Sequence, residues 1–226
     1  MIATDSESCL INWKNGGAQA ARSISFSLCY HFVRSYSDTR ALFICDRSSI
    51  ERSFPDVVGF EPPLTNHFLP VYLHKIDMKY AQDLLSLKKI LASMHLWLQA
   101  PALIVISDLS LIIDPLHTMQ RSESTFMELI LSVMGLLDDL SNYYLREKGF
   151  APRIVITDED SKGAYVKMTR RLVPTMWDLT LLQDEGFTLL KHTGVDWEPV
   201  ELYSAFAWRN GGYALEALLA TEDPVS

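Results

Sequence analysis

The sequence has only three cysteines, Cys9, Cys29 and Cys45, and all of them lie in its first quarter. They are too few and too scattered for a disulfide framework, so we expect reduced, buried cysteines in an intracellular protein. No apolar run approaches the roughly 20 residues of a membrane-spanning helix, and residues 1–8 are too polar and acidic for a secretory signal. These absences predict a protein of the cytosol or nucleus that does not contact membranes.

The usual patterns of metal sites and activated nucleophiles are also missing. The six histidines have no HxxxH spacing, the cysteines have no CxxC spacing, and there is no Gly-x-Ser-x-Gly motif. We therefore expect no metal site and no catalytic residue of these classes. The net charge of −8 argues against a surface built as a whole to hold nucleic acid, although it leaves room for a local basic patch.

Apolar residues, in contrast, make up 48% of the chain, which is enough to build a core. Strand-like runs alternate with helical patterns, and two runs, 41–45 and 102–107, are apolar on both faces, as central parallel strands are. The expected strands are Ser8–Trp13, Arg40–Asp46, Pro70–Lys75, Ala102–Ser107 and Arg153–Thr157. The expected helices are Ala20–Val33, Met78–Leu98 and Ser122–Lys148, the last ended by Gly149. The pattern predicts an α/β protein with a central, mostly parallel sheet flanked by helices.

The apolar period changes to two after Pro174. Four runs then alternate with turn residues, which predicts an antiparallel β part over about residues 174–219, ending in a hairpin at the sheet edge. The runs are Met176–Leu182, Phe187–His192, Tyr203–Arg209 and Tyr213–Leu219, with turns at 183–186 and 210–212. We expect one domain over residues 1–226.

The segment Gly16–Ser23 follows the first expected strand and opens the first expected helix, the position of a phosphate-binding loop. In the Walker A pattern, Gly is followed after four residues by Gly-Lys and then Ser or Thr. Gly16 and Ser23 fit that pattern, Gly17 adds a second glycine, and Ala21 and Arg22 replace the second Gly and the Lys. One interpretation is a degenerate nucleotide loop; the other is a strand-to-helix turn that binds no ligand.

The run Leu103–Asp108 is an apolar strand ending in aspartate, as in the Walker B motif, where the carboxylate orients Mg²⁺. Many buried strands also end in Asp because the next turn needs a cap. A similar run at Met134–Asp139 continues a helical period, so we interpret it as helix.

The segment Thr157–Pro174 leaves the carboxyl end of another expected strand, where ligand-contacting loops of open α/β sheets lie. It begins acidic and then carries Lys162, Lys167, Arg170 and Arg171, for a net charge of about +1. It is either a loop that faces DNA or a partner protein, or a solvated connector.

The order of these parts resembles the RecA-like recombinase family, over about residues 8–219. The chain looks most like the small recombinase paralogues that lack an N-terminal helical domain and form one half of a heterodimer, including the partner of SWIM-type zinc proteins. The segment Trp208–Leu215 resembles their final hairpin. The resemblance implies a RecA-like P-loop core, homologous-recombination repair in the nucleus, and a second paralogue as partner. The departures at Ala21 and Arg22 leave ATP and Mg²⁺ to be held mainly by that partner.

Three functional hypotheses follow. The first is a non-enzymatic subunit, a pseudo-ATPase, whose heterodimer docks on recombinase filaments and stabilises or remodels them, so that single-stranded DNA is contacted indirectly or weakly. The second is an ATP-binding P-loop ATPase in DNA repair, for which the carboxylate after the second strand is Asp46. The third is a DNA-binding module that uses the basic residues of 157–174.

Overall fold

Six strands lie side by side and parallel in the order β4-β2-β5-β6-β1-β7. The strands are β1 (Cys9–Lys14), β2 (Ala41–Cys45), β4 (Ile76–Tyr80), β5 (Leu103–Ile106), β6 (Arg153–Glu159) and β7 (Thr175–Leu181). Every residue of β2 and β5 is buried, because helices cover both faces of the sheet there. The predicted α/β class with a parallel sheet is confirmed.

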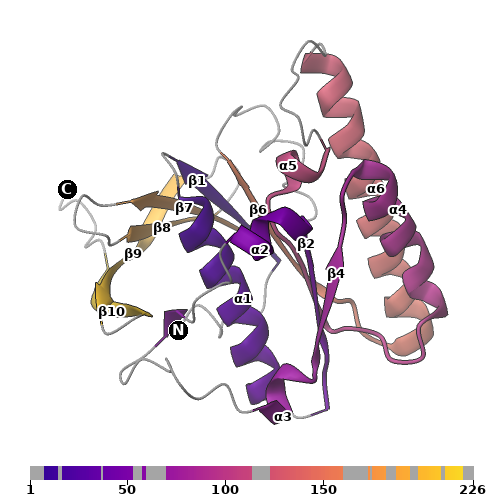
Figure 1. Ribbon diagram of the computed structural model, residues 1–226, viewed down its shortest axis with the longest axis horizontal. Coiled ribbons are helices and arrows are strands. Elements are labelled where there is room, and N and C mark those ends of the chain that lie inside the picture. Colours follow the sequence, from indigo (N-terminus) through magenta and orange to yellow (C-terminus); the bar gives the residue numbers. More distant parts are fainter. Residues whose placement is uncertain are drawn as a thin grey trace.

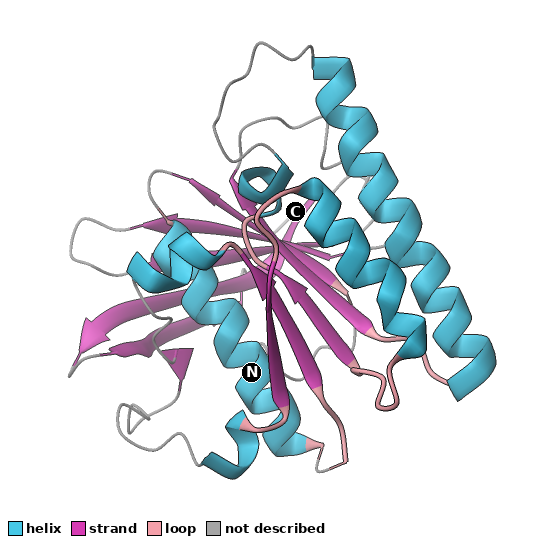
Figure 2. Ribbon diagram, turned by 45° about the vertical axis from the view of Figure 1, so that its right-hand side comes forward, coloured by secondary structure: helices cyan, strands magenta, loops and turns pink. Residues whose placement is uncertain are grey.

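The structure is a computed structural model that describes residues 8–14, 17–36, 38–52, 58–59, 70–113, 123–159, 173, 175–181, 187–193, 198–209 and 212–220. In these ranges, α1 lies on one face of the sheet and α4, α5 and α6 lie on the other (Figures 1 and 2). Their bounds are α1 (Ala18–Ser35), α4 (Leu84–Ser93), α5 (Leu109–Ile113) and α6 (Glu123–Lys148). None of the helices in these ranges has the length and apolar character needed to cross a bilayer.

Two apolar cores hold the layers together. Under α1, the rings of Phe26 and Phe43 meet edge to face with their centres 5.5 Å apart. On the opposite face, Ile130 and Leu137 of α6 are fully buried in the same cluster as Ile104 of β5. Successive residues of the central strands therefore contribute to alternate cores, which fixes the side of the sheet on which each polar residue at a strand end lies.

Beyond β7 the sheet continues in antiparallel order through β8, β9 and β10, and the short β3 pairs with β10. The bounds are β3 (Val58–Gly59), β8 (Phe187–Thr193), β9 (Glu198–Arg209) and β10 (Gly212–Ala220). The antiparallel pairings of β7 to β10 fall in the region for which the sequence predicts antiparallel structure, whereas β3 lies outside that region and pairs with β10 in parallel. The predicted turn at 183–186 and the first two residues of the predicted turn at 210–212 lie outside the described residues, and Gly212 begins β10.

The predicted strand at Pro70–Lys75 is wrong. This segment begins with a short helix, α3 (Pro70–Leu73), and the strand follows at Ile76–Tyr80, where Ile76 pairs with Ala41 of β2. Proline suits the first turn of a helix because its missing N–H is not needed there. A short apolar run does not distinguish a helical turn from a strand, and here the pairing with β2 decides the register.

The predicted helix Met78–Leu98 begins too early, because residues 78–80 belong to strand β4, which pairs with β2. It starts at Leu84, where Asp83 and Ser86 form a capping box: the Asp83 carboxylate accepts the Ser86 N–H at 2.7 Å and Ser86 Oγ accepts the Asp83 N–H at 3.0 Å. The helix ends at Ser93 and a 3-10 turn, η2 (Met94–Leu96), follows.

The other helix predictions are confirmed within about two residues, including the assignment of Met134–Asp139 to helix. Gly149 follows α6 with φ +76°, the left-handed conformation that lets glycine end a helix. Strands β1, β2 and β5 share one parallel sheet, but the expectation that all three are neighbours is wrong for β1, because β6 lies between β5 and β1.

Candidate functional site

The carboxyl ends of β1, β5 and β6 meet the start of α1 around a cavity of about 400 Å³. Its walls include Trp13 at the end of β1, Arg22 on α1, Asp108 after β5, and Asp158 and Glu159 at the end of β6. The edge of a parallel sheet where strands end is the usual ligand-binding position of open α/β folds. The cavity is therefore the candidate site.

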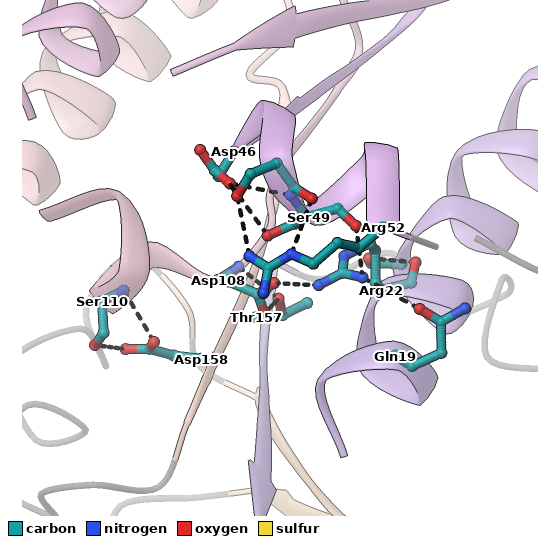
Figure 3. Close-up of polar contacts among 11 residues, drawn as sticks. Gln19, Arg22, Asp46, Ser49, Arg52, Asp108, Ser110, Thr157 and Asp158 are labelled. Atoms are coloured by element: carbon teal, nitrogen blue, oxygen red, sulfur yellow. Dashed lines mark hydrogen bonds and ion pairs between the residues drawn. The ribbon is translucent and has the colours of Figure 1, made fainter. Parts of the chain in front are cut away.

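A buried ion pair crosses this cavity. Arg22 Nη2 lies 3.1 Å from Asp108 Oδ2, and the two side chains are only 7% and 6% exposed. The other terminal nitrogen, Nη1, donates to Gln19 Oε1 at 3.1 Å and to the Ser49 carbonyl at 3.3 Å. Figure 3 shows the Arg22 guanidinium between Asp108 and Gln19. The predicted loop residue and the predicted strand-end aspartate are thus brought together.

Asp108 is held in an uncommon backbone conformation. Its φ is +57°, the only positive φ of a non-glycine residue in the described ranges. Aspartate tolerates this left-handed region better than most residues, although it still carries strain. Thr157 of β6 supports the conformation, because its Oγ1 accepts the Asp108 N–H at 2.9 Å and donates to Asp108 Oδ1 at 3.4 Å.

The electrostatics of Asp108 reflect two opposed effects. Burial raises the pKa of its carboxyl group, and the nearby Arg22 guanidinium lowers it in part. Burial is the larger effect, so the pKa of Asp108 stays above its ordinary value even with Arg22 beside it.

Asp158 is a second buried acid that sequence reasoning did not select. Its carboxylate accepts the Ser110 N–H at 2.9 Å and the Ser110 hydroxyl at 2.6 Å, which fixes the start of α5 to β6. Burial raises the pKa of Asp158 to about 7, against the lowering effect of the Ser110 bonds. The signal was present in the sequence, because Asp158 follows an apolar strand just as Asp108 does.

The segment predicted as a phosphate loop is mostly helical. Helix α1 begins at Ala18, and the Ala21 N–H already donates to the Gly17 carbonyl at 2.9 Å. Ala21, Arg22 and Ser23 lie in its first two turns instead of in a loop, while Gly16 lies outside the described residues. Alanine and glutamine are good helix formers, which explains why the helix extends to Ala18.

Asp46, the candidate carboxylate after the second strand, caps a short helix. Its Oδ2 accepts the Ser49 N–H at 3.0 Å and a hydroxyl bond from Ser48 at the start of α2 (Arg47–Arg52). The basic residues of the predicted DNA- or partner-facing loop, Lys162, Lys167, Arg170 and Arg171, lie outside the described residues.

No protein-family model matches this chain, and no curated protein matches it in sequence.

Proposed function

We propose that this protein is a RecA-like pseudo-ATPase, the non-enzymatic subunit of a recombinase-paralogue complex. In the proposal it pairs with a second paralogue in the nucleus, and the pair stabilises or remodels recombinase filaments on single-stranded DNA during homologous-recombination repair. The observation that carries the loss of ATPase function is the buried ion pair between Arg22 and Asp108. The repair function rests on the family resemblance of the sequence.

The ion pair engages the two charged groups that a nucleotide site needs, the cation of Arg22 and the carboxylate of Asp108. In a P-loop ATPase the loop cation faces phosphate oxygens and the strand-end aspartate helps to hold Mg²⁺. Here the cation and the carboxylate neutralise each other at 3.1 Å. Breaking a buried pair costs about 3–5 kcal/mol, which binding of MgATP would have to offset. We infer that ATP and Mg²⁺ are held mainly by the partner subunit.

The start of α1 supports the same inference. A phosphate loop holds phosphate with backbone N–H groups that are not bonded to the chain itself. At Ala21 that N–H group is already bonded within α1, and Ala21 carries a fully buried Cβ where close approach of backbone to phosphate is required.

The strand order supports the RecA-like part of the proposal. In a Rossmann sheet the second strand lies beside the first. In this sheet β5 and β6 lie between β2 and β1, and antiparallel strands continue beyond β7. This arrangement agrees with the P-loop core that the sequence resemblance implies. The net charge of −8 favours action through a partner over a DNA-binding surface of its own.

Titration with a fluorescent ATP analogue and Mg²⁺ tests the first part. We expect no saturable binding up to about 1 mM, the upper end of ordinary KM values, and no phosphate release. The matched variant Ala21→Gly/Arg22→Lys restores the residues of the Walker A pattern and checks that the assay can detect nucleotide binding. Saturable Mg²⁺-dependent binding by the natural sequence, lost in Asp108→Ala, would instead support the alternative of an ATP-binding P-loop ATPase, which the cavity at the sheet edge favours.

Affinity purification of the tagged chain, with mass identification of bound proteins, tests the second part. We expect a RecA-like paralogue in equimolar amount. Recovery of the chain as a lone monomer from cells that express its paralogues would contradict the proposal.

A further inference from the structure

The carboxylates of the cavity outnumber the cations that can serve them. Asp108, Asp158 and Glu159 line it together with Arg22 and Arg52. Arg22 is engaged with Asp108, and Arg52 donates to the Ser48 carbonyl at 3.1 Å and to Ser48 Oγ at 3.0 Å. Within the described ranges, neither Asp158 nor Glu159 has an ion-pair partner.

Asp158 shows most clearly that a positive charge is missing. It is 1% exposed, and its side-chain carboxylate accepts from the N–H and hydroxyl of Ser110 and from the backbone N–H of Glu159, all of them without charge. A buried carboxylate is costly unless a cation faces it. The raised pKa of Asp158, about 7 because of burial, expresses that cost. Figure 3 shows Asp158 turned to Ser110, with Asp108 and Thr157 between it and the Arg22 guanidinium in this view.

An aromatic wall defines which cation fits. Trp13 lines the same cavity, and indole is the aromatic ring that attracts cations most strongly. A planar guanidinium stacks on such a ring and bonds a carboxylate with two parallel N–H groups, which a lysine ammonium does not do. The cavity volume of about 400 Å³ lies in the range of small-ligand pockets, so one side chain can enter.

We propose that this cavity receives an arginine side chain from a partner protein, with its guanidinium at the end of β6, beside Trp13 and facing the carboxylates of Asp158 and Glu159. This inference rests on the proposed function, because a cavity without a nucleotide is required. It assigns to the cavity a contact with a protein cation in place of a phosphate.

The probe is the tripeptide acetyl-Gly-Arg-Gly-amide, titrated into the whole chain carrying carbon-13 in its Asp and Glu carboxyl groups. We expect the Asp158 and Glu159 resonances to shift in a saturable way, and the peptide to bind about tenfold more tightly at pH 8 than at pH 6, because Asp158 ionises between these values. The neutral isostere acetyl-Gly-citrulline-Gly-amide should produce no shift. A third peptide, acetyl-Gly-Lys-Gly-amide, should bind more weakly than the arginine peptide. Equal shifts with the citrulline peptide, equal binding of the lysine peptide, or no saturable shift would each overturn the assignment.

Variants locate the contact. Asp158→Asn and Glu159→Gln should each weaken peptide binding at least fivefold, while Asp139→Asn on the exposed face of α6 should leave it unchanged. Glu159 is exposed, so Glu159→Gln keeps the test available even if Asp158→Asn does not fold. Equal weakening by Asp139→Asn would indicate general attraction to an acidic protein and overturn the proposal. The MgATP titration distinguishes a failure of the proposed function from a failure of the arginine contact. Saturable binding of ATP overturns the proposed function. If neither ATP nor the arginine peptide binds, only the arginine contact is overturned.

Discussion

Arg22→Ala should destabilise the protein far more than the loss of a surface arginine. The substitution leaves the Asp108 carboxylate, which is 6% exposed, without the guanidinium that lies 3.1 Å away. At an effective dielectric constant of about 20, two charges at this distance attract by about 5 kcal/mol. Removal of one member of a buried pair typically costs about 3–5 kcal/mol, and we expect a loss in that range near pH 7.5. The free energy of unfolding is measured by urea titration followed by tryptophan fluorescence.

The dependence on pH and a double-mutant cycle identify the cause. Burial raises the pKa of Asp108 and Arg22 lowers it, so without Arg22 the pKa rises further and the folded protein keeps a proton that the unfolded chain loses. The loss of stability in Arg22→Ala should therefore grow as the pH rises and shrink at acidic pH. Arg22→Ala/Asp108→Ala should recover part of the loss, and Arg34→Ala, an exposed residue of the same helix, should have little effect. A loss that is independent of pH, with no coupling between Arg22 and Asp108, would refute this reasoning.

Two further predictions concern Asp158 and two glycines, one inside α6 and one just after it. The pKa of Asp158 is about 7 in the folded protein against an ordinary value of 3.8, so the free energy of unfolding should fall by up to about 1.4 kcal/mol per pH unit between pH 4 and 7. Urea titrations at several pH values measure this slope. Asp158→Asn should remove the slope, and Asp139→Asn should retain it. Gly149→Ala should lower the free energy of unfolding by about 1 kcal/mol, because the φ of Gly149 is +76°. Gly135→Ala should raise it by about 0.5–1 kcal/mol, because Gly135 lies inside α6 with open space around its Cβ position. Thermal denaturation that shows the same sign for both variants would contradict the backbone argument.

The central strands could be predicted because their residues are apolar at successive positions, which indicates burial on both faces. Runs such as Ala41–Cys45 are apolar at every position, a pattern that a strand covered on both faces requires. The edge strand β4 lacks this signal, since Asp77, Lys79 and Tyr80 are polar or amphipathic, and its position is set by pairing with β2. The capping box at Asp83 was readable locally, but the apolar period of Met78–Leu98 concealed it.

Two residues of the candidate site, Arg22 and Asp108, could be selected from the sequence, but the geometry of the site could not. Asp108 fits the Walker B position and Arg22 stands at the Lys position of Walker A, but the sequence gives no signal that residues 86 positions apart form an ion pair. The pairing depends on the parallel order that brings the end of β5 close to the start of α1. Asp158 was overlooked because it was grouped with the acidic residues that follow it, although it is the last buried residue of β6.

Under the proposed function, three features of the site belong to one physical change. The guanidinium of Arg22 neutralises Asp108 in place of phosphate or Mg²⁺, and the backbone from Ala18 onward forms helix instead of a loop with unbonded N–H groups. Ala21, where a Cβ would obstruct phosphate, then becomes a fully buried core contact. Replacing Arg22 by Lys alone would leave the helical start and the buried Ala21 in place, so we expect nucleotide binding to return only when the backbone at residue 21 is released as well. In the same proposal, the cavity at the edge of the sheet, with its carboxylates and Trp13, binds a protein cation instead.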